Sequence, residues 1–344
     1  MRRPLALFAC LTVLLGAASV AGAAERWSAS AWASADIRLV VSRGLMARDV
    51  GTFRPDDPLT LGELNALVAG LQSKPAVAAA TASGAPVSLT QLDARLVATL
   101  GLSGTASAFL SGARAAGLTP PARFGTETVA RLLGLRFNHP HGTDNLELAP
   151  TDPVTRAETA YSAARVLRFS GWETAAARDA ATTFVLPELT AWQQRVLNTA
   201  VKLIGYPYVW GGTTELAQAP LGTEVKGGFD CSGFVWRVYR GQQYAGGARL
   251  AKVLRGRTAA AMAGEVTAAR RIPLARLAPG DLLFFAPGGP RARPAAVDHM
   301  GIYVGSGWLI HSSRYGVALA QVTNGWYRDR LAWGRRPLAE AGLV

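Results

Sequence analysis

Cys231, one of two cysteines in the 344-residue sequence, lies in a context that favours nucleophilic chemistry. It follows Asp230, and the apolar residues after it recur at helical spacing. Aspartate commonly caps helix N-termini, so we expect Cys231 in the first turn of a helix, where backbone N–H dipoles favour a thiolate and a developing oxyanion. The alternative is a small, inert core residue. The neighbouring motifs favour the nucleophile.

Two histidines are expected on one face of a β-hairpin. Residues 299–304 alternate between apolar and other positions, and a Gly-Ser-Gly loop leads to a second strand over residues 308–313. This loop sets Ile302 opposite Ile310, which makes His299 and His311 diagonal neighbours within about 7–8 Å at the backbone. One imidazole is then placed to act as base and the other to orient it. Two unrelated strand histidines are the alternative.

Other segments of this half are expected to form the scaffold. A helix begins near Thr190, and the motif at residues 205–212, which contains Tyr208, follows it directly. A Pro-Gly turn leads into an apolar run at residues 282–285, which is typical of a buried strand.

Together these segments resemble the NlpC family of cell-wall cysteine peptidases over about residues 190–335. The resemblance implies an α+β, papain-like fold, in which a helix bearing the cysteine packs on an antiparallel sheet bearing the histidines. It implies a Cys-His-His thiol mechanism on peptidoglycan stem peptides, around D-glutamate and diaminopimelate, with no cofactor and no metal ion. The catalytic residues it implies are Cys231, His299 and His311, with Tyr208, Asp230 and Ser232 beside the nucleophile as substrate or oxyanion residues.

Two stretches are longer than the family pattern, residues 213–226 and 286–297. We expect both to flank the cleft and to influence substrate preference. The bond that is cut, and the choice between diaminopimelate and lysine, stay open.

The N-terminal half contains a recurring helix-start signature, in which Thr or Ser precedes Glu or Gln by three residues and forms a capping box. The three pairs are Thr60 and Glu63, Ser88 and Gln91, and Thr155 and Glu158. With the Gly-Thr-Phe-Arg-Pro-Asp loop at residues 51–56, they resemble S-layer homology modules over residues 27–73 and 130–170. Family members often bind anionic wall polymers, and Arg156 matches the family motif, whereas Leu61 replaces the arginine in the first copy. A helical spacer is the alternative.

The N-terminus has the pattern of a signal peptide: two arginines, an apolar run over residues 5–20 and small residues at 21–23. The run is short for a membrane span, so we expect an exported, cell-wall-associated protein with no transmembrane segment in its mature form. Cys10 lies in that run, which leaves one cysteine after cleavage and no intramolecular disulfide. The domains expected are a signal peptide (1–23), helical S-layer-homology-like repeats (24–170), a linker (171–189) and the peptidase domain (190–344).

The net charge and its distribution along the chain limit the kinds of partner that the protein is expected to bind. The net charge is +13, and residues 186–344 hold 19 Lys and Arg against 9 Asp and Glu, a net of +10. A basic catalytic half is attracted to polyanions, and for an exported protein we expect wall polymers rather than nucleic acid. His139 and His141 lack further ligands nearby, so no metal site is expected there. Two rival functions stay open: an amidase or acyltransferase on the same scaffold, and a catalytically silent wall-binding protein.

Overall fold

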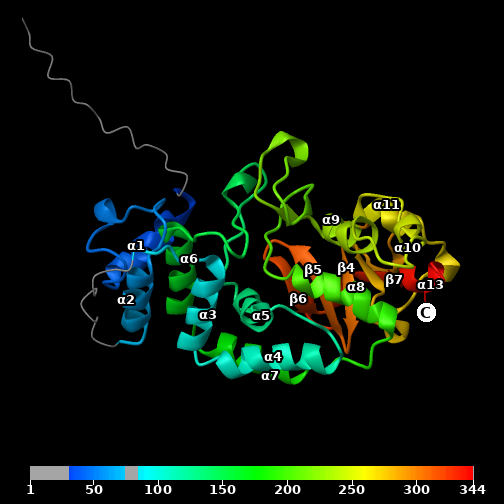
Figure 1. Ribbon diagram of the computed structural model, residues 1–344, viewed down its shortest axis with the longest axis horizontal. Helices are drawn as coiled ribbons and strands as arrows, with labels where there is room; N and C mark the ends of the chain where they lie inside the picture. Colours follow the sequence, from blue (N-terminus) through cyan, green and yellow to red (C-terminus); the bar gives the residue numbers. More distant parts are fainter. Residues whose placement is uncertain (1–30, 74–83, 344) are drawn as a thin grey trace, which may run out of the picture.

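The computed structural model describes residues 31–73 and 84–343, and the predicted signal peptide over residues 1–23 lies outside them. Helices form the N-terminal half, and an antiparallel sheet with covering helices forms the C-terminal half (Figure 1). The helices of the first half are α1 (Ser34–Ser42), α2 (Leu61–Leu71), α3 (Leu89–Thr99), α4 (Ser103–Ala115), α5 (Phe124–Leu132), α6 (Arg156–Leu167) and α7 (Trp172–Thr182). The second half contains α8 (Ala191–Lys202), β1 (Thr213–Thr214), β2 (Gly228–Phe229), α9 (Cys231–Trp236), α10 (Leu250–Val253), α11 (Ala259–Gly264), β3 (Leu282–Phe285), β4 (His299–Gly305), β5 (Trp308–Ser313), β6 (Gly316–Gln321), α12 (Gly325–Arg330), β7 (Leu331–Arg335) and α13 (Pro337–Glu340).

The three expected repeats meet in a closed ring of backbone hydrogen bonds. The N–H of Leu59 donates to Val154, that of Val154 donates to Val87, and that of Val87 donates back to Leu59, each at 2.9 Å. All three side chains are buried. Each residue immediately precedes a helix start, so the ring joins the N-terminal ends of α2, α3 and α6. The recurring signature in the sequence therefore marks three segments that pair with one another in space.

The helix caps are formed as the signature predicts in the first two copies. Thr60 with Glu63, and Ser88 with Gln91, form reciprocal capping boxes at α2 and α3. At α6 only half of the box exists, because Thr155 accepts the N–H of Glu158 while the Glu158 carboxylate bonds His139 at 2.8 Å. In the third copy the acidic residue, Glu158, therefore holds the loop that contains His139 instead of completing the cap.

Arg156, the residue retained from the S-layer homology motif, is bonded within the protein. Its side chain is only 3% exposed, and it donates to the carbonyls of Phe53 and Met46 at 2.7 Å each. It also forms an ion pair with Glu63 of the first copy. These bonds make Arg156 a brace between the first and third copies, with its guanidinium bonded inside the protein.

The main sheet has five antiparallel strands in the order β6-β5-β4-β3-β7. β4 and β5 form the expected hairpin, with Ile302 opposite Ile310 as the sequence predicts. The turn differs, because a bulge places Trp308 opposite Gly305 rather than Val304. Ser306 and Gly307 both have positive φ angles, 49° and 79°, which is the signature of a tight type I′ turn that matches strand twist.

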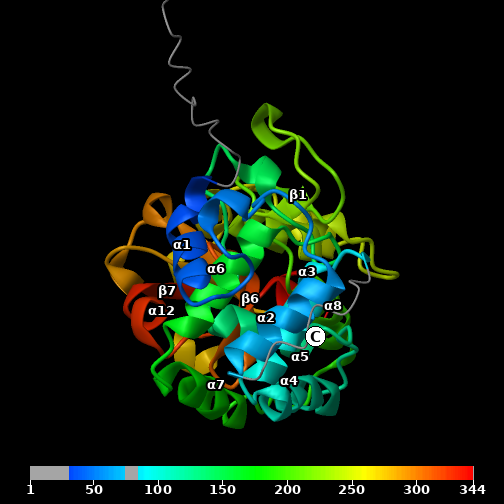
Figure 2. The same cartoon turned by 90° about the vertical axis from the view of Figure 1, so that its left-hand side faces the viewer.

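The helix α9 packs on β4 and β5, which confirms the predicted α+β class with a cysteine-bearing helix on an antiparallel sheet. Phe234 and Val235 of α9 are fully buried in the same core as Met300 and Ile302 of β4. The two halves share this core, because α5 lies between the N-terminal helices and the sheet and contacts β6 (Figures 1 and 2).

The segment predicted as a linker, residues 171–189, is structured. Most of it forms α7, which packs against α4, and the Phe184 ring after it lies 5.4 Å from that of Trp308 on β5. The Trp308 indole also donates to the Thr183 carbonyl at 3.2 Å. The alanine-rich helix α7 packs closely against α4, and Phe184 after it packs against Trp308 of the C-terminal half.

Across the described parts of the chain, residues 31–73 and 84–343, no single helix has the length and apolar composition needed to cross a bilayer. Taken together, α3 and α4 meet both criteria, but they are bent by 118° relative to each other.

Candidate active site

Cys231 is the first residue of α9. The Asp230 side chain caps this helix by accepting the Gly233 N–H at 2.5 Å. The backbone N–H groups of Ser232 and Met300 both act to lower the pKa of the Cys231 thiol, and Met300 directly follows His299 on β4. The helix α9 therefore lies against β4, the strand that bears His299.

The environment of Cys231 keeps the resting thiol protonated. The pKa of Cys231 is raised to about 12, chiefly by burial and in smaller part by the adjacent Asp230 carboxylate. The two backbone N–H groups and the Arg257 guanidinium act in the opposite direction. Because burial is the largest effect, the structure favours a neutral thiol that loses its proton only as it reacts.

His299 and His311 meet as the strand register requires. His299 Nε2 lies 2.8 Å from His311 Nδ1, and the two rings stand edge to face. Burial lowers the pKa of His299 to about 4 and holds that of His311 well below its usual range. Both rings are therefore neutral at physiological pH, as a proton acceptor must be.

Tyr327 of α12 extends the chain of hydrogen bonds from His299 through His311. No motif in the sequence indicates this tyrosine. Its hydroxyl lies 3.1 Å from His311 Nε2. With His299 Nδ1 free to take a proton, the consistent assignment has His299 Nε2–H donating to His311 Nδ1 and His311 Nε2–H donating to Tyr327. His311 thus orients His299, and Tyr327 fixes the tautomer of His311.

Asp230 and Ser232 lie beside Cys231, and their side chains form hydrogen bonds at the start of α9. Ser232 Oγ donates to Asp230 Oδ1 at 2.9 Å, and Arg257 contacts both carboxylate oxygens of Asp230 at 3.1 and 2.9 Å. The same guanidinium donates to Ser232 Oγ at 2.8 Å and to the Gly211 carbonyl at 2.9 Å. Arg257, which the sequence analysis did not single out, therefore ties the Trp-Gly-Gly motif to the cap of α9.

His299 and Tyr208 open into a cleft of about 920 Å³. Burial raises the pKa of the Tyr208 phenol, and negative charge at Cys231 or Asp230 would raise it further, so the hydroxyl stays a donor. The cleft is lined by Asn138, His139, Pro140, His141, Tyr208, Trp210, Asp298, His299, Ser313, Arg314, Tyr315, Trp326 and Tyr327. Cys231, Asp230, Ser232 and His311 are absent from this lining.

The walls of the cleft differ from expectation. Neither of the long stretches, residues 213–226 and 286–297, contributes to the lining. One wall is instead formed by residues 138–141 of the N-terminal half. The contributing loop follows α5 and is held by Glu158, whose diverted carboxylate bonds His139.

Among the residues that the structure describes, no group of three or more His, Cys, Asp or Glu side chains is arranged to hold a metal ion. His139 bonds Glu158, and His141 Nδ1 lies 3.5 Å from Asp144 Oδ2.

A cysteine at a helix start, set against a sheet that bears two hydrogen-bonded histidines on neighbouring strands, agrees with the comparison of this sequence with known families. Residues 205–336 match the NlpC/P60 family. This part of the chain is therefore similar to NlpC/P60 domains. Residues 27–64 match the S-layer homology domain, which agrees with the first of the three repeats.

Several known proteins resemble this domain. The gamma-D-glutamyl-L-lysine dipeptidyl-peptidase of Bacillus subtilis is 30% identical over 42% of this chain and 41% of its own length. The murein DD-endopeptidase MepH of Escherichia coli is 31% identical over 43% of this chain and 46% of its own. A solved NlpC/P60 family protein from Bacillus cereus shares 26% identity over 45% of this chain and 42% of its own, with a TM-score of 0.32. The chain thus spans less than half the length of these relatives.

Proposed function

We propose that this protein is a cell-wall hydrolase that cuts amide bonds in peptidoglycan stem peptides by a cysteine mechanism. The observation that carries the proposal is the His299–His311 hydrogen bond on β4 and β5, beside the start of the helix that bears Cys231. The relatives support the substrate class, because both curated names describe peptidases, one acting on a γ-D-glutamyl bond and one on murein.

The mechanism begins from the neutral pair. His299 takes the Cys231 proton as the sulfur attacks the amide carbonyl, because the buried thiol is not ionised beforehand. The Cys231 N–H, which has no partner within its own helix at this first position, and the Tyr208 hydroxyl donate to the oxyanion. His299 then protonates the leaving amine, and water releases the acyl group from the sulfur.

The cleft suits a peptide that carries carboxylates. Arg314 lines it, and Trp210 and Trp326 expose aromatic surface there, at 52% and 47%. Stem peptides carry free carboxylates, and the net charge of +10 over residues 186–344 attracts the anionic wall. We therefore place the protein at the cell wall, exported by the predicted signal peptide.

The N-terminal repeats are the part of the chain that would bind an anionic wall polymer. Arg156 is bonded to Phe53, Met46 and Glu63, so polymer binding would have to use other residues of the repeats.

The decisive experiment is digestion of defined muropeptides, with products analysed by mass spectrometry. The wild type should release stem-peptide fragments and Cys231→Ala should release none, while both proteins retain the same melting temperature. Fragment release by the alanine variant would remove Cys231 from the mechanism. Cleavage between the glycan and the first stem residue would identify an amidase, and transfer to an added amine would identify an acyltransferase. No reaction by the wild type would support the silent wall-binding alternative.

A further inference from the structure

The segment that carries Tyr208 is held by the N-terminal half at three places. Arg131 of α5 donates to the Gly205 carbonyl at 2.5 Å. Asn138 pairs with the backbone of Tyr208, and Asp144 accepts the Trp210 N–H at 3.4 Å. Phe229, within residues 205–336, also bonds the backbone on either side of Tyr208, so the segment is held both from inside that region and from the N-terminal half.

The contact at Tyr208 is the most specific of the three. Asn138 Oδ1 accepts the Tyr208 N–H at 2.9 Å, and Asn138 Nδ2 donates to the Tyr208 carbonyl at 3.1 Å. One amide side chain thus satisfies both backbone groups of one residue, as a neighbouring strand would. Such two-point pairing fixes the peptide plane on either side of the Tyr208 Cα, and with it the direction of the phenol.

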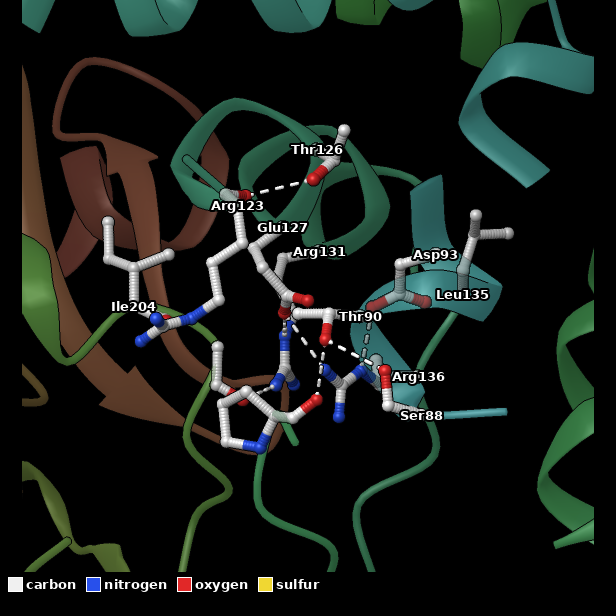
Figure 3. A network of polar contacts seen from close by, with 12 residues as sticks. Ser88, Thr90, Asp93, Arg123, Thr126, Glu127, Arg131, Leu135, Arg136 and Ile204 are labelled. Carbon is white, nitrogen blue, oxygen red and sulfur yellow. Dashed lines mark hydrogen bonds and ion pairs between the residues drawn. The ribbon is translucent and has the colours of Figure 1, made fainter. Parts of the chain in front are cut away.

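The support behind this contact is rigid and buried. Arg131 and Arg136 lie in a cluster with Asp93 and Glu127 between the N-terminal helices and the sheet (Figure 3). Arg136 bonds Glu127 at 2.8 Å and Asp93 at 3.0 Å, and all four side chains are at most 4% exposed. Arg136 precedes Asn138 by two residues, so the cluster fixes the start of the loop that contains Asn138.

The same guanidinium of Arg131 also contacts the turn between β5 and β6, where Tyr315 lines the cleft. It donates to the Tyr315 carbonyl. A side chain at Gly316 would meet Arg131 Nη1 at 2.8 Å and the Tyr206 carbonyl at 2.4 Å. Glycine at this position is what allows Arg131 to pass between the two cleft segments.

We infer that the N-terminal helical half contributes directly to the catalytic centre. Asn138 is the positioning residue for Tyr208, and residues 138–141 form a wall of the substrate cleft. This inference rests on the proposed function, because it concerns the same cleft and the same oxyanion donor. It assigns to the N-terminal half a role in positioning active-site residues, separate from any binding of the cell wall.

The test compares Asn138→Ala with Asn198→Ala in the full chain. Asn198 is a matched control, because its side chain also joins the two halves, accepting the Thr119 N–H at 2.6 Å, but it contacts no residue of the cleft. Displacing a transition-state donor by about 1 Å costs on the order of 100-fold in rate, so we expect Asn138→Ala to lower kcat by about 10- to 100-fold with KM little changed. Asn198→Ala should keep the wild-type kcat.

A double-mutant cycle separates positioning from general destabilisation. In a Tyr208→Phe background the hydroxyl is already gone, so Asn138→Ala should cause little further loss. Asn138→Asp, which keeps the acceptor and the size, provides a second variant if the alanine protein does not fold, and it should lose less activity than Asn138→Ala.

Three outcomes would overturn the inference: an Asn138→Ala enzyme with wild-type kcat, an undiminished effect in the Tyr208→Phe background, or an equal loss in Asn198→Ala. Failure of the proposed function looks different, since the wild type would then release no fragments or Cys231→Ala would remain active.

Discussion

Replacing His311 by alanine tests the orienting role of this histidine most directly. His311 is 2% exposed, and it accepts from His299 Nε2 at 2.8 Å while lying 3.1 Å from the Tyr327 hydroxyl. The alanine variant removes the acceptor and leaves the His299 N–H without a partner in a buried site. His299 then loses both the bond that holds its tautomer and the group that stabilises its charged form.

The magnitude follows from that unpaired group. An unsatisfied buried donor costs about 1–3 kcal/mol. At about 1.4 kcal/mol per tenfold change in rate, this predicts a loss of about 5- to 150-fold in kcat. KM should change little, because His311 is absent from the cleft lining and the charge on His299 develops only in the reaction.

The assay is steady-state cleavage of a defined muropeptide, with the melting temperature as a check on folding. His311→Asn should recover much of the lost rate, because the asparagine Oδ1 lies close to where the imidazole Nδ1 was. Tyr327→Phe should cost about 2- to 10-fold, since it removes one neutral hydrogen bond worth about 0.5–1.5 kcal/mol. An His311→Ala enzyme with unchanged kcat, or a loss that appears only in KM, would refute the reasoning.

Three further predictions concern pH, stability and thiol reactivity. The acid limb of kcat/KM should lie near pH 4 rather than 6.5, because burial lowers the pKa of His299 to about 4 and the base works only while neutral; a limb near pH 6.5 would contradict this. Arg136→Met should lower the free energy of unfolding in urea by about 3–5 kcal/mol, because two buried carboxylates lose their partner, whereas Arg54→Ala, at an exposed ion pair, should cost under about 1 kcal/mol. Arg257→Gln should raise the pKa of the Cys231 thiol, seen as iodoacetamide alkylation that begins at higher pH than in the wild type, and an unchanged profile would exclude the charge effect.

The chemistry of this protein is determined largely by local sequence. Asp230 caps the helix that starts at Cys231 because a capping residue acts within three positions of itself. His299 and His311 meet because a strand alternates with period two and a tight turn sets the register. Both effects operate over a few residues, so they can be predicted without knowing how the rest of the chain packs.

The repeats were predictable for the same reason, but their arrangement was not. The signature at Thr60, Ser88 and Thr155 predicts where three helices begin. The ring that joins Leu59, Val87 and Val154 depends on which segments come together in the fold. Likewise, residues 171–189 have a linker-like composition, and only packing against α4 and Trp308 makes them part of the core.

The surroundings of the site depend on tertiary structure alone. Tyr327 reaches His311 from a later helix, Arg257 reaches Asp230 across 27 residues, and Asn138 reaches Tyr208 across 70. No spacing or periodicity connects such pairs, because long-range contacts are set by the packing of whole elements. For that reason the sequence alone indicated a candidate nucleophile, its base and the histidine that orients the base, whereas the folded chain decided which distant residues support them and which segment forms a wall of the cleft.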